Sequence, residues 1–115
     1  MDIRRKTYKE MITVNSREEL KELIKQRIEE QGPKCDLNDI DVSRVKDMHG
    51  LFFYSSFDGD ISGWDVSNVE DMSYMFSGSK FSGNLSKWDV SKAKTKFCMF
   101  FGSPLDGGNE PEWYK

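Results

Sequence analysis

Apolar residues recur at helical spacing in one long segment of the chain, residues 16–33. The stripe consists of Leu20, Leu23, Ile24 and Ile28, with charged residues at the positions between them. The segment begins with Ser16-Arg17-Glu18-Glu19, a capping box in which the Ser16 hydroxyl accepts from the Glu19 backbone N–H and the Glu19 carboxylate reaches back. It ends at Gly32-Pro33, where the chain leaves the helical conformation. The pattern predicts an amphipathic helix that lies against the rest of the chain.

The segment just before this helix has the composition of a strand. Residues from Tyr8 to Asn15 are rich in β-branched and large side chains, which predicts a short strand. We therefore expect a strand-helix cap over residues 1–34.

The rest of the chain repeats with a period of 24 residues. The tripeptide Asp-Val-Ser occurs at 41–43, 65–67 and 89–91. Apolar positions share this register: Leu37, Ile61 and Leu85; Ile40, Trp64 and Trp88; Leu51, Met75 and Met99; Phe52, Phe76 and Phe100; Phe57, Phe81 and Leu105. A fixed period of 20 to 50 residues is typical of solenoids, in which neighbouring units bury each other's apolar side chains. Trp64 and Trp88 are accordingly expected in the core.

Each unit divides into two predicted pieces. Residues 60–65 are extended and predict a short parallel strand, laddered to its equivalents. Residues 67–70 form a second capping box, followed by a short helix or 3₁₀ turn. The fold class predicted is α/β: a short leucine-rich-repeat-like solenoid of about three 24-residue units, residues 35–107, with an N-terminal strand-helix cap and a tail at 108–115. All 115 residues then form a single domain.

Two runs of sequence resemble a known family. Phe57–Phe76 and Phe81–Ser91 are similar to the BspA-like leucine-rich-repeat unit of bacterial surface proteins and mycoplasma lipoproteins, and the resemblance extends over about residues 36–107. The resemblance implies a leucine-rich-repeat-like solenoid without catalytic residues, which acts by binding proteins or cell-surface material. The chain departs from the family in having fewer than three full units and no export signal or lipid-anchor cysteine at its start.

Charge is unevenly distributed along the chain. The net charge is −3, but residues 35–76 hold nine acidic and two basic residues. Nucleic-acid binding through phosphates needs a clustered basic surface, so direct contact with nucleic acid is not expected.

No apolar run approaches the 18 or so residues that span a bilayer, and charged residues begin the chain. The expectation is a cytoplasmic protein with no membrane contact, whose Cys35 and Cys98 are free thiols, with Cys98 buried among phenylalanines.

Catalytic chemistry is not expected from this sequence. His49 is the single histidine, so the chain offers no Ser-His or Cys-His pair beyond it and no histidine cluster for zinc. Asp39-Ile-Asp41 and Asp58-Gly-Asp60 lack the twelve-residue loop of a calcium site. Asp41, Asp65 and Asp89 each precede a serine by two residues, a spacing that favours Asx turns. We predict no enzyme activity, no cofactor and no metal.

The function predicted is that of a non-enzymatic protein-binding module. Its expected contact residues are the exposed polar residues of the acidic units: Asp58, Asp60, Ser62, Glu70 and Asp71. The alternative is an inhibitor encoded by a phage or mobile element, similar in action to an anti-CRISPR protein, whose acidic surface competes for a basic channel of a host nucleic-acid-handling enzyme. Trp113 and Tyr114 are expected either to cover the last unit as a lid or to contact a partner. The chain is expected to be a monomer or to self-associate weakly through its C-terminal repeat end.

Overall fold

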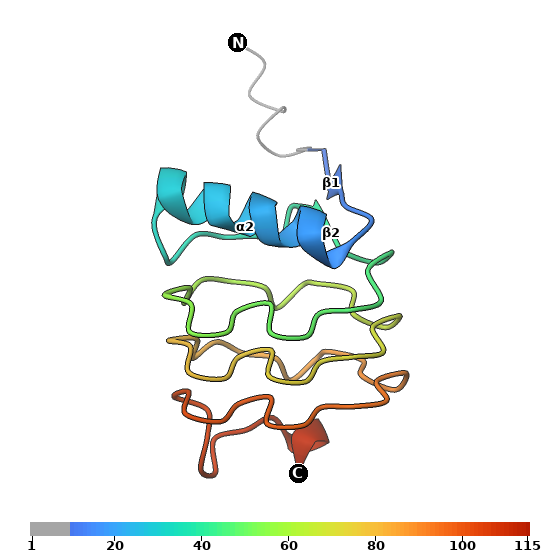
Figure 1. Ribbon diagram of the computed structural model, residues 1–115, viewed down its shortest axis with the longest axis vertical. Coiled ribbons are helices and arrows are strands. Elements are labelled where there is room, and N and C mark those ends of the chain that lie inside the picture. The colour runs from blue at the N-terminus through green and yellow to red at the C-terminus, as the bar shows by residue number, and fades with distance from the viewer. Residues whose placement is uncertain (1–9) are drawn as a thin grey trace.

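The computed structural model describes residues 10–115, with one α-helix, one small sheet and a short 3₁₀ helix. The chain order is β1 (Ile12–Thr13), α2 (Arg17–Gln31), β2 (Ile40–Asp41) and η1 (Glu112–Tyr114). The two strands pair in parallel, with Ile12 opposite Ile40. Figure 1 shows α2 across one end of the molecule, the remaining chain in successive layers beneath it, and the C-terminus at the opposite end. A strand is predicted from Tyr8 to Asn15, and the structure has the shorter strand β1 within that range. Residues 8 and 9 lie outside the described residues.

Helix α2 starts and ends where the sequence predicts. The Ser16 hydroxyl accepts from the backbone N–H of Glu19 at 3.1 Å. The Glu19 carboxylate accepts from the N–H of Asn15 at 2.6 Å, one residue before the expected partner, so the capping box is displaced by one position. At the other end Gly32 has φ of 90°, and its N–H donates to the carbonyl of Ile28. Glycine adopts this left-handed region at no steric cost, which explains why the helix stops there.

The buried face of α2 contains a charged residue that the apolar stripe did not reveal. Leu20, Ile24 and Arg27 are buried, whereas Leu23 and Ile28 are half-buried. The Arg27 guanidinium donates to both carboxylate oxygens of Asp39, at 2.9 and 2.6 Å, and the two side chains are 9% and 10% exposed. The hydrogen bond to Asp39 raises the pKa of Arg27. This bidentate pair joins the helix to the chain just before β2.

The predicted fold class, an α/β leucine-rich-repeat-like solenoid of about three 24-residue units, is wrong. Residues 60–65 form no strand and residues 67–76 form no helix. Outside β1 and β2, the β-bridges in the described residues are isolated parallel ones, such as Asp36 with Asp60 and Asp47 with Asp71. Instead of regular elements, residues 35–107 form turns, in which some N–H groups bond to carbonyls three residues earlier, such as Leu51 to Met48, and others bond to the next layer, such as Phe52 to Met75. The described residues form a small compact unit with one helix and a two-stranded parallel sheet.

A turn within the predicted strand explains how two side chains three residues apart both face inward. The N–H of Trp64 donates to the carbonyl of Ile61 at 3.2 Å, and both side chains are buried. The predicted capping box at residues 67–70 is also wrong. Ser67 donates to Asp65, and the Glu70 carboxylate pairs with Lys94 at 3.4 Å. Short-range turns therefore replace the strand and the helix expected in each unit.

Two columns of stacked rings run through the core. Phe52, Phe76 and Phe100 lie nearly parallel, with centroids 5.4 and 5.5 Å apart. Trp64, Trp88 and Trp113 stack in the same way at 6.5 and 6.4 Å. The three indole N–H groups donate to the carbonyls of Leu37, Ile61 and Leu85, at 2.9, 3.1 and 2.8 Å. Trp113 occupies the third position although it lies 25 residues after Trp88, so the tail covers the last layer as a lid.

Asx turns close the corners that the sequence indicated. The Asp41 carboxylate accepts from the N–H and hydroxyl of Ser43 at 3.0 and 2.7 Å, and Asp65 does the same with Ser67. Asp89 accepts from the N–H of Ser91 at 3.0 Å. The hydrogen bonds from Ser43 lower the pKa of Asp41, with the side-chain bond as the largest cause. These carboxylates therefore have a structural role.

The Asp41 turn gives a pH-dependent prediction. A carboxyl group with a lowered pKa in the folded state stabilises the fold above its unfolded pKa, and this contribution is lost as the pH falls through the folded pKa. We expect the free energy of unfolding to fall with acidification below about pH 4. In a carbon-detected NMR titration, Asp41 should titrate below its usual pKa and move up in Ser43→Ala, while Asp89 is unchanged. An Asp41 midpoint that is the same in both proteins would contradict the assignment.

Candidate functional site

A group of exposed aromatic side chains stands outside the core. Phe53, Tyr54, Tyr74 and Phe97, which we call the aromatic face, are between 42% and 73% exposed. Their rings meet edge to face, with centroids 4.6 Å apart for Phe53 and Tyr54, 6.4 Å for Phe53 and Tyr74, and 5.7 Å for Tyr74 and Phe97. Phe101, four residues after Phe97, is also exposed. Adjacent exposed apolar rings of this kind mark interaction surfaces more often than single exposed residues do.

The backbone beneath the aromatic face is held in an unusual conformation. Tyr54 and Tyr74 have φ of 53° and 57°, in the left-handed region that disfavours residues with a side chain by about 1–2 kcal/mol. Their N–H groups donate to the carbonyls of Ser77 and Phe97, both at 2.9 Å. The Tyr54 ring lies against Gly78, where an added Cβ would come within 2.7 Å of the ring. Hydrogen bonds to the next layer therefore hold the backbone from which these two rings project.

Cys98 has the same left-handed backbone conformation, and the expectation that it is buried is wrong. Its φ is 52°, and its side chain is half-buried instead of buried among Phe97, Phe100 and Phe101. Cys35 is buried, and both residues are free thiols, as the sequence suggested.

A groove runs between helix α2 and the aromatic face. One section of about 410 Å³ has these lining residues: Arg17, Lys21, His49, Gly50, Leu51, Phe53 and Tyr74. It adjoins a section of about 580 Å³ along α2, and the two sections share Arg17, Lys21, Leu51 and Phe53. We call the first section the Gly50 groove. It is bounded by cationic side chains from the helix and by the side chains of Leu51, Phe53 and Tyr74 from the two nearest layers.

Arg17 connects helix α2 to the layer that contains His49. Its Nε donates to the backbone carbonyl of His49 at 2.6 Å, and its side chain is 15% exposed. Nη1 lies 3.4 Å from the exposed carboxylate of Glu18. Because the guanidinium is held at Nε, its position at the edge of the Gly50 groove is set by the fold and not by the partner that it meets.

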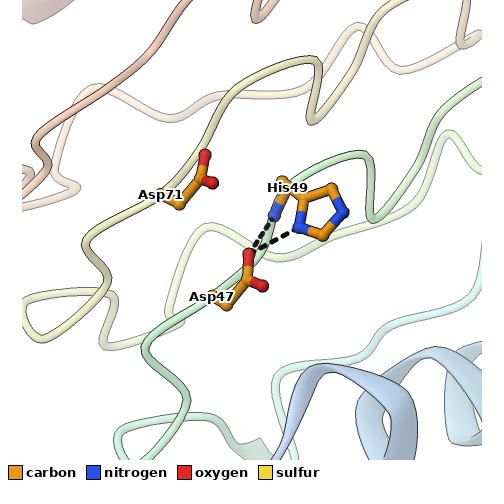
Figure 2. Close-up of side chains that lie close together, drawn as sticks. All are labelled: Asp47, His49 and Asp71. Carbon is orange, nitrogen blue, oxygen red and sulfur yellow. Dashed lines mark hydrogen bonds and ion pairs between the residues drawn. The ribbon is translucent and has the colours of Figure 1, made fainter.

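One cluster of metal-ligating side chains adjoins the Gly50 groove. Figure 2 shows Asp47, His49 and Asp71, whose potential ligand atoms all lie within 4.8 Å of one another. The parallel bridge between Asp47 and Asp71 brings the two carboxylates together. A histidine with two carboxylates is a donor set that suits several divalent metals. The sequence draws attention to two other pairs of aspartates, Asp39 with Asp41 and Asp58 with Asp60, and not to this cluster.

Hydrogen bonds of the turns account for this cluster. An oxygen of Asp47 accepts from the His49 N–H at 3.0 Å and lies 2.8 Å from His49 Nδ1, and an oxygen of Asp71 accepts from the N–H and hydroxyl of Ser73. Burial alone would raise the pKa of Asp47, but the hydrogen bonds from His49 outweigh it and the pKa is lowered. This arrangement is that of the other Asx turns, so we assign no metal site to it.

The five predicted contact residues are engaged in separate hydrogen-bond groups. Asp58 accepts from the N–H and hydroxyl of Ser82 at 2.8 and 2.9 Å, and Asp60 accepts from those of Ser62 at 2.9 and 2.7 Å. Glu70 pairs with Lys94. Asp71 lies beside His49, which lines the Gly50 groove. Within residues 10–115, no hydrogen bond or ion pair joins the first three of these residues to the last two.

The aromatic face was not predicted from the sequence, because its residues do not recur in the 24-residue register. A signal was nevertheless present: the buried pairs of the register are Leu51-Phe52, Met75-Phe76 and Met99-Phe100. An aromatic residue next to such a pair must point away from it, as Phe53 and Tyr74 do.

The chain matches a protein family over most of its length. Residues 18–107 match the family described as Mycoplasma protein of unknown function, DUF285, and the chain belongs to that family. No curated protein and no solved structure matches it. Within the described residues, no helix is both long and apolar enough to cross a membrane.

Proposed function

We propose that this protein is a non-enzymatic protein-binding module, and that the aromatic face is the surface that contacts its partner. The observation that carries the proposal is the row of edge-to-face contacts from Tyr54 through Phe53 and Tyr74 to Phe97, all outside a core that other rings already fill. Aromatic residues and arginine are enriched where proteins bind one another and supply most of the energy there.

Rigidity supports the proposal as well. Binding usually loses about 0.5–1.5 kcal/mol for each flexible side chain that it orders. Tyr54 and Tyr74 are anchored by backbone hydrogen bonds in the left-handed conformation, and their rings rest on neighbouring rings or on Gly78. The conformational entropy that these two side chains lose when a partner binds is therefore smaller.

The resemblance of residues 57–91 to the BspA-like unit favours a binding function too, since that family acts by binding proteins or cell-surface material. We carry over the binding role and not the leucine-rich-repeat architecture, which the structure contradicts. The family to which the chain belongs has no described activity of its own.

We do not propose the alternative function, an inhibitor that competes for a basic channel through an acidic surface. Asp58, Asp60 and Asp71 each accept two hydrogen bonds from a serine, which gives these carboxylates a role in the fold. An inhibitor that competes through its charge would lose its target at raised salt, whereas binding through aromatic side chains would not.

Site-specific photocrosslinking tests the proposal. p-Benzoylphenylalanine replaces Tyr74 in one protein and Ser62, a predicted contact residue, in a matched control. After irradiation in cells that express the protein, we expect a defined protein adduct at position 74 and none at position 62. An adduct at position 62 alone, or none at either, would exclude the aromatic face.

A further inference from the structure

We infer that the Gly50 groove binds a partner segment in which a carboxylate lies next to an aromatic or aliphatic side chain. This inference rests on the proposed binding function and specifies the chemistry of the segment. It follows from the charge of the groove lining, the fixed position of Arg17 and the shape of the apolar wall.

Among the described residues, the lining of the Gly50 groove includes two cations, Arg17 and Lys21, and no carboxylate. They lie four residues apart, so α2 presents them on the same face, whereas the adjoining section is lined by Lys25 and also by Glu18, Glu22 and Glu29. Of the carboxylates beside His49, Asp47 accepts from His49 and Asp71 accepts from Ser73, and neither lines the Gly50 groove. Two adjacent cations at the edge of an apolar groove attract an anionic group and disfavour a cationic one.

Arg17 is positioned to receive a carboxylate. Its Nε bond to the His49 carbonyl fixes the plane of the guanidinium, and its Nη2 lies 3.8 Å from the point where a Cβ on Gly50 would be. The planar fork of arginine matches the two oxygens of a carboxylate. The contact of Nη1 with Glu18 is at 3.4 Å, and Glu18 is 79% exposed, so an incoming carboxylate displaces a weak partner.

The apolar lining of the groove favours an apolar side chain next to that carboxylate in the partner segment. Leu51 is buried at the floor, while Phe53 and Tyr74 keep about half of their surface exposed. The volume of about 410 Å³ is within the range of sites that enclose a small ligand, and so it can take one large side chain. A segment that lies here also touches the aromatic face through Phe53 and Tyr74.

An NMR titration with a minimal probe tests the inference. N-Acetyltryptophan carries an indole and a carboxylate, and N-acetyltryptophanamide is its neutral match. In the ¹⁵N-labelled protein, the acid should shift the amide signals of Gly50, Leu51 and Phe53, and bind about fivefold more tightly than the amide, a difference of about 1 kcal/mol. Lys21→Glu should abolish this preference, whereas Lys87→Glu should keep it, because Lys87 lies outside this groove.

Equal affinity for the acid and the amide would overturn the inference, as would shifts elsewhere, no shifts at millimolar probe, or the same behaviour of both lysine variants. The crosslinking experiment distinguishes the two proposals. If Tyr74 still forms a protein adduct while the acid shows no preference, the binding function stands and the anionic segment is wrong.

Discussion

Phe76→Ala is expected to lower the free energy of unfolding by about 4 kcal/mol, the middle of the range for a buried phenylalanine. Phe76 is fully buried, with its ring centroid 5.4 Å from Phe52, 5.5 Å from Phe100 and 4.7 Å from Phe81. Alanine leaves a cavity in the middle of a stacked column, which the rings on both sides cannot fill without losing their own contacts. Urea denaturation followed by circular dichroism measures the change.

Phe97→Ala is the matched control for this prediction. The same side-chain atoms are removed at a position that is 63% exposed, so the change should stay within about 0.5 kcal/mol. Equal losses in the two variants would mean that the rings of Phe52, Phe76 and Phe100 do not form the core described above.

Arg27→Met is expected to destabilise the protein by about 3 kcal/mol. The methionine keeps most of the length of the side chain but leaves Asp39 without the guanidinium in a site where it is 10% exposed, and removal of one partner of a buried ion pair typically has this effect. Because Asp39 precedes β2, the loss should loosen the contact of α2 with the layers below. Urea denaturation reports the stability, and hydrogen exchange of the α2 amides reports the docking of the helix.

Lys25→Met provides the comparison on the same helix. Lys25 is an exposed cation, so this substitution should change the stability by less than about 0.5 kcal/mol. If Arg27→Met were equally mild, the bidentate pair would not anchor the helix.

The helix was predictable from sequence because its signals are local. The Ser16 cap, the apolar stripe and Gly32-Pro33 lie within 18 residues, and the helix runs from Arg17 to Gln31 as those signals indicate. The Arg27 pair was not predictable, because a charged residue beside an apolar stripe gives no sign of the carboxylate that it will meet.

The repeating positions identified buried residues correctly but not the backbone that holds them. Ile61 and Trp64 are both buried, as their register suggested, and Asp41 closes its predicted turn. The predicted strands and short helices failed because backbone N–H groups divide between carbonyls of the next layer and carbonyls three residues back, and a local pattern does not show which. The N–H of Met48, for example, donates to Asp71 across the layers, whereas the N–H of Trp64 bonds three residues back.

The candidate site was the least predictable feature. Aspartates and serines of the acidic units resembled a binding surface in sequence, but the structure uses their side chains to close turns and join layers. The aromatic face emerges only when Phe53, Tyr74 and Phe97 are brought together from three layers.

The binding affinity of the partner captured at position 74 tests the central proposal most directly. Tyr74→Asn is the informative variant, because asparagine tolerates the left-handed backbone and a small amide replaces the ring. With the purified partner, we predict that Tyr74→Asn and Phe97→Ala each raise Kd at least about tenfold, while Ser62→Ala leaves it unchanged. An unchanged Kd for both aromatic variants, or a loss confined to Ser62→Ala, would contradict the proposal that the aromatic face is the binding surface.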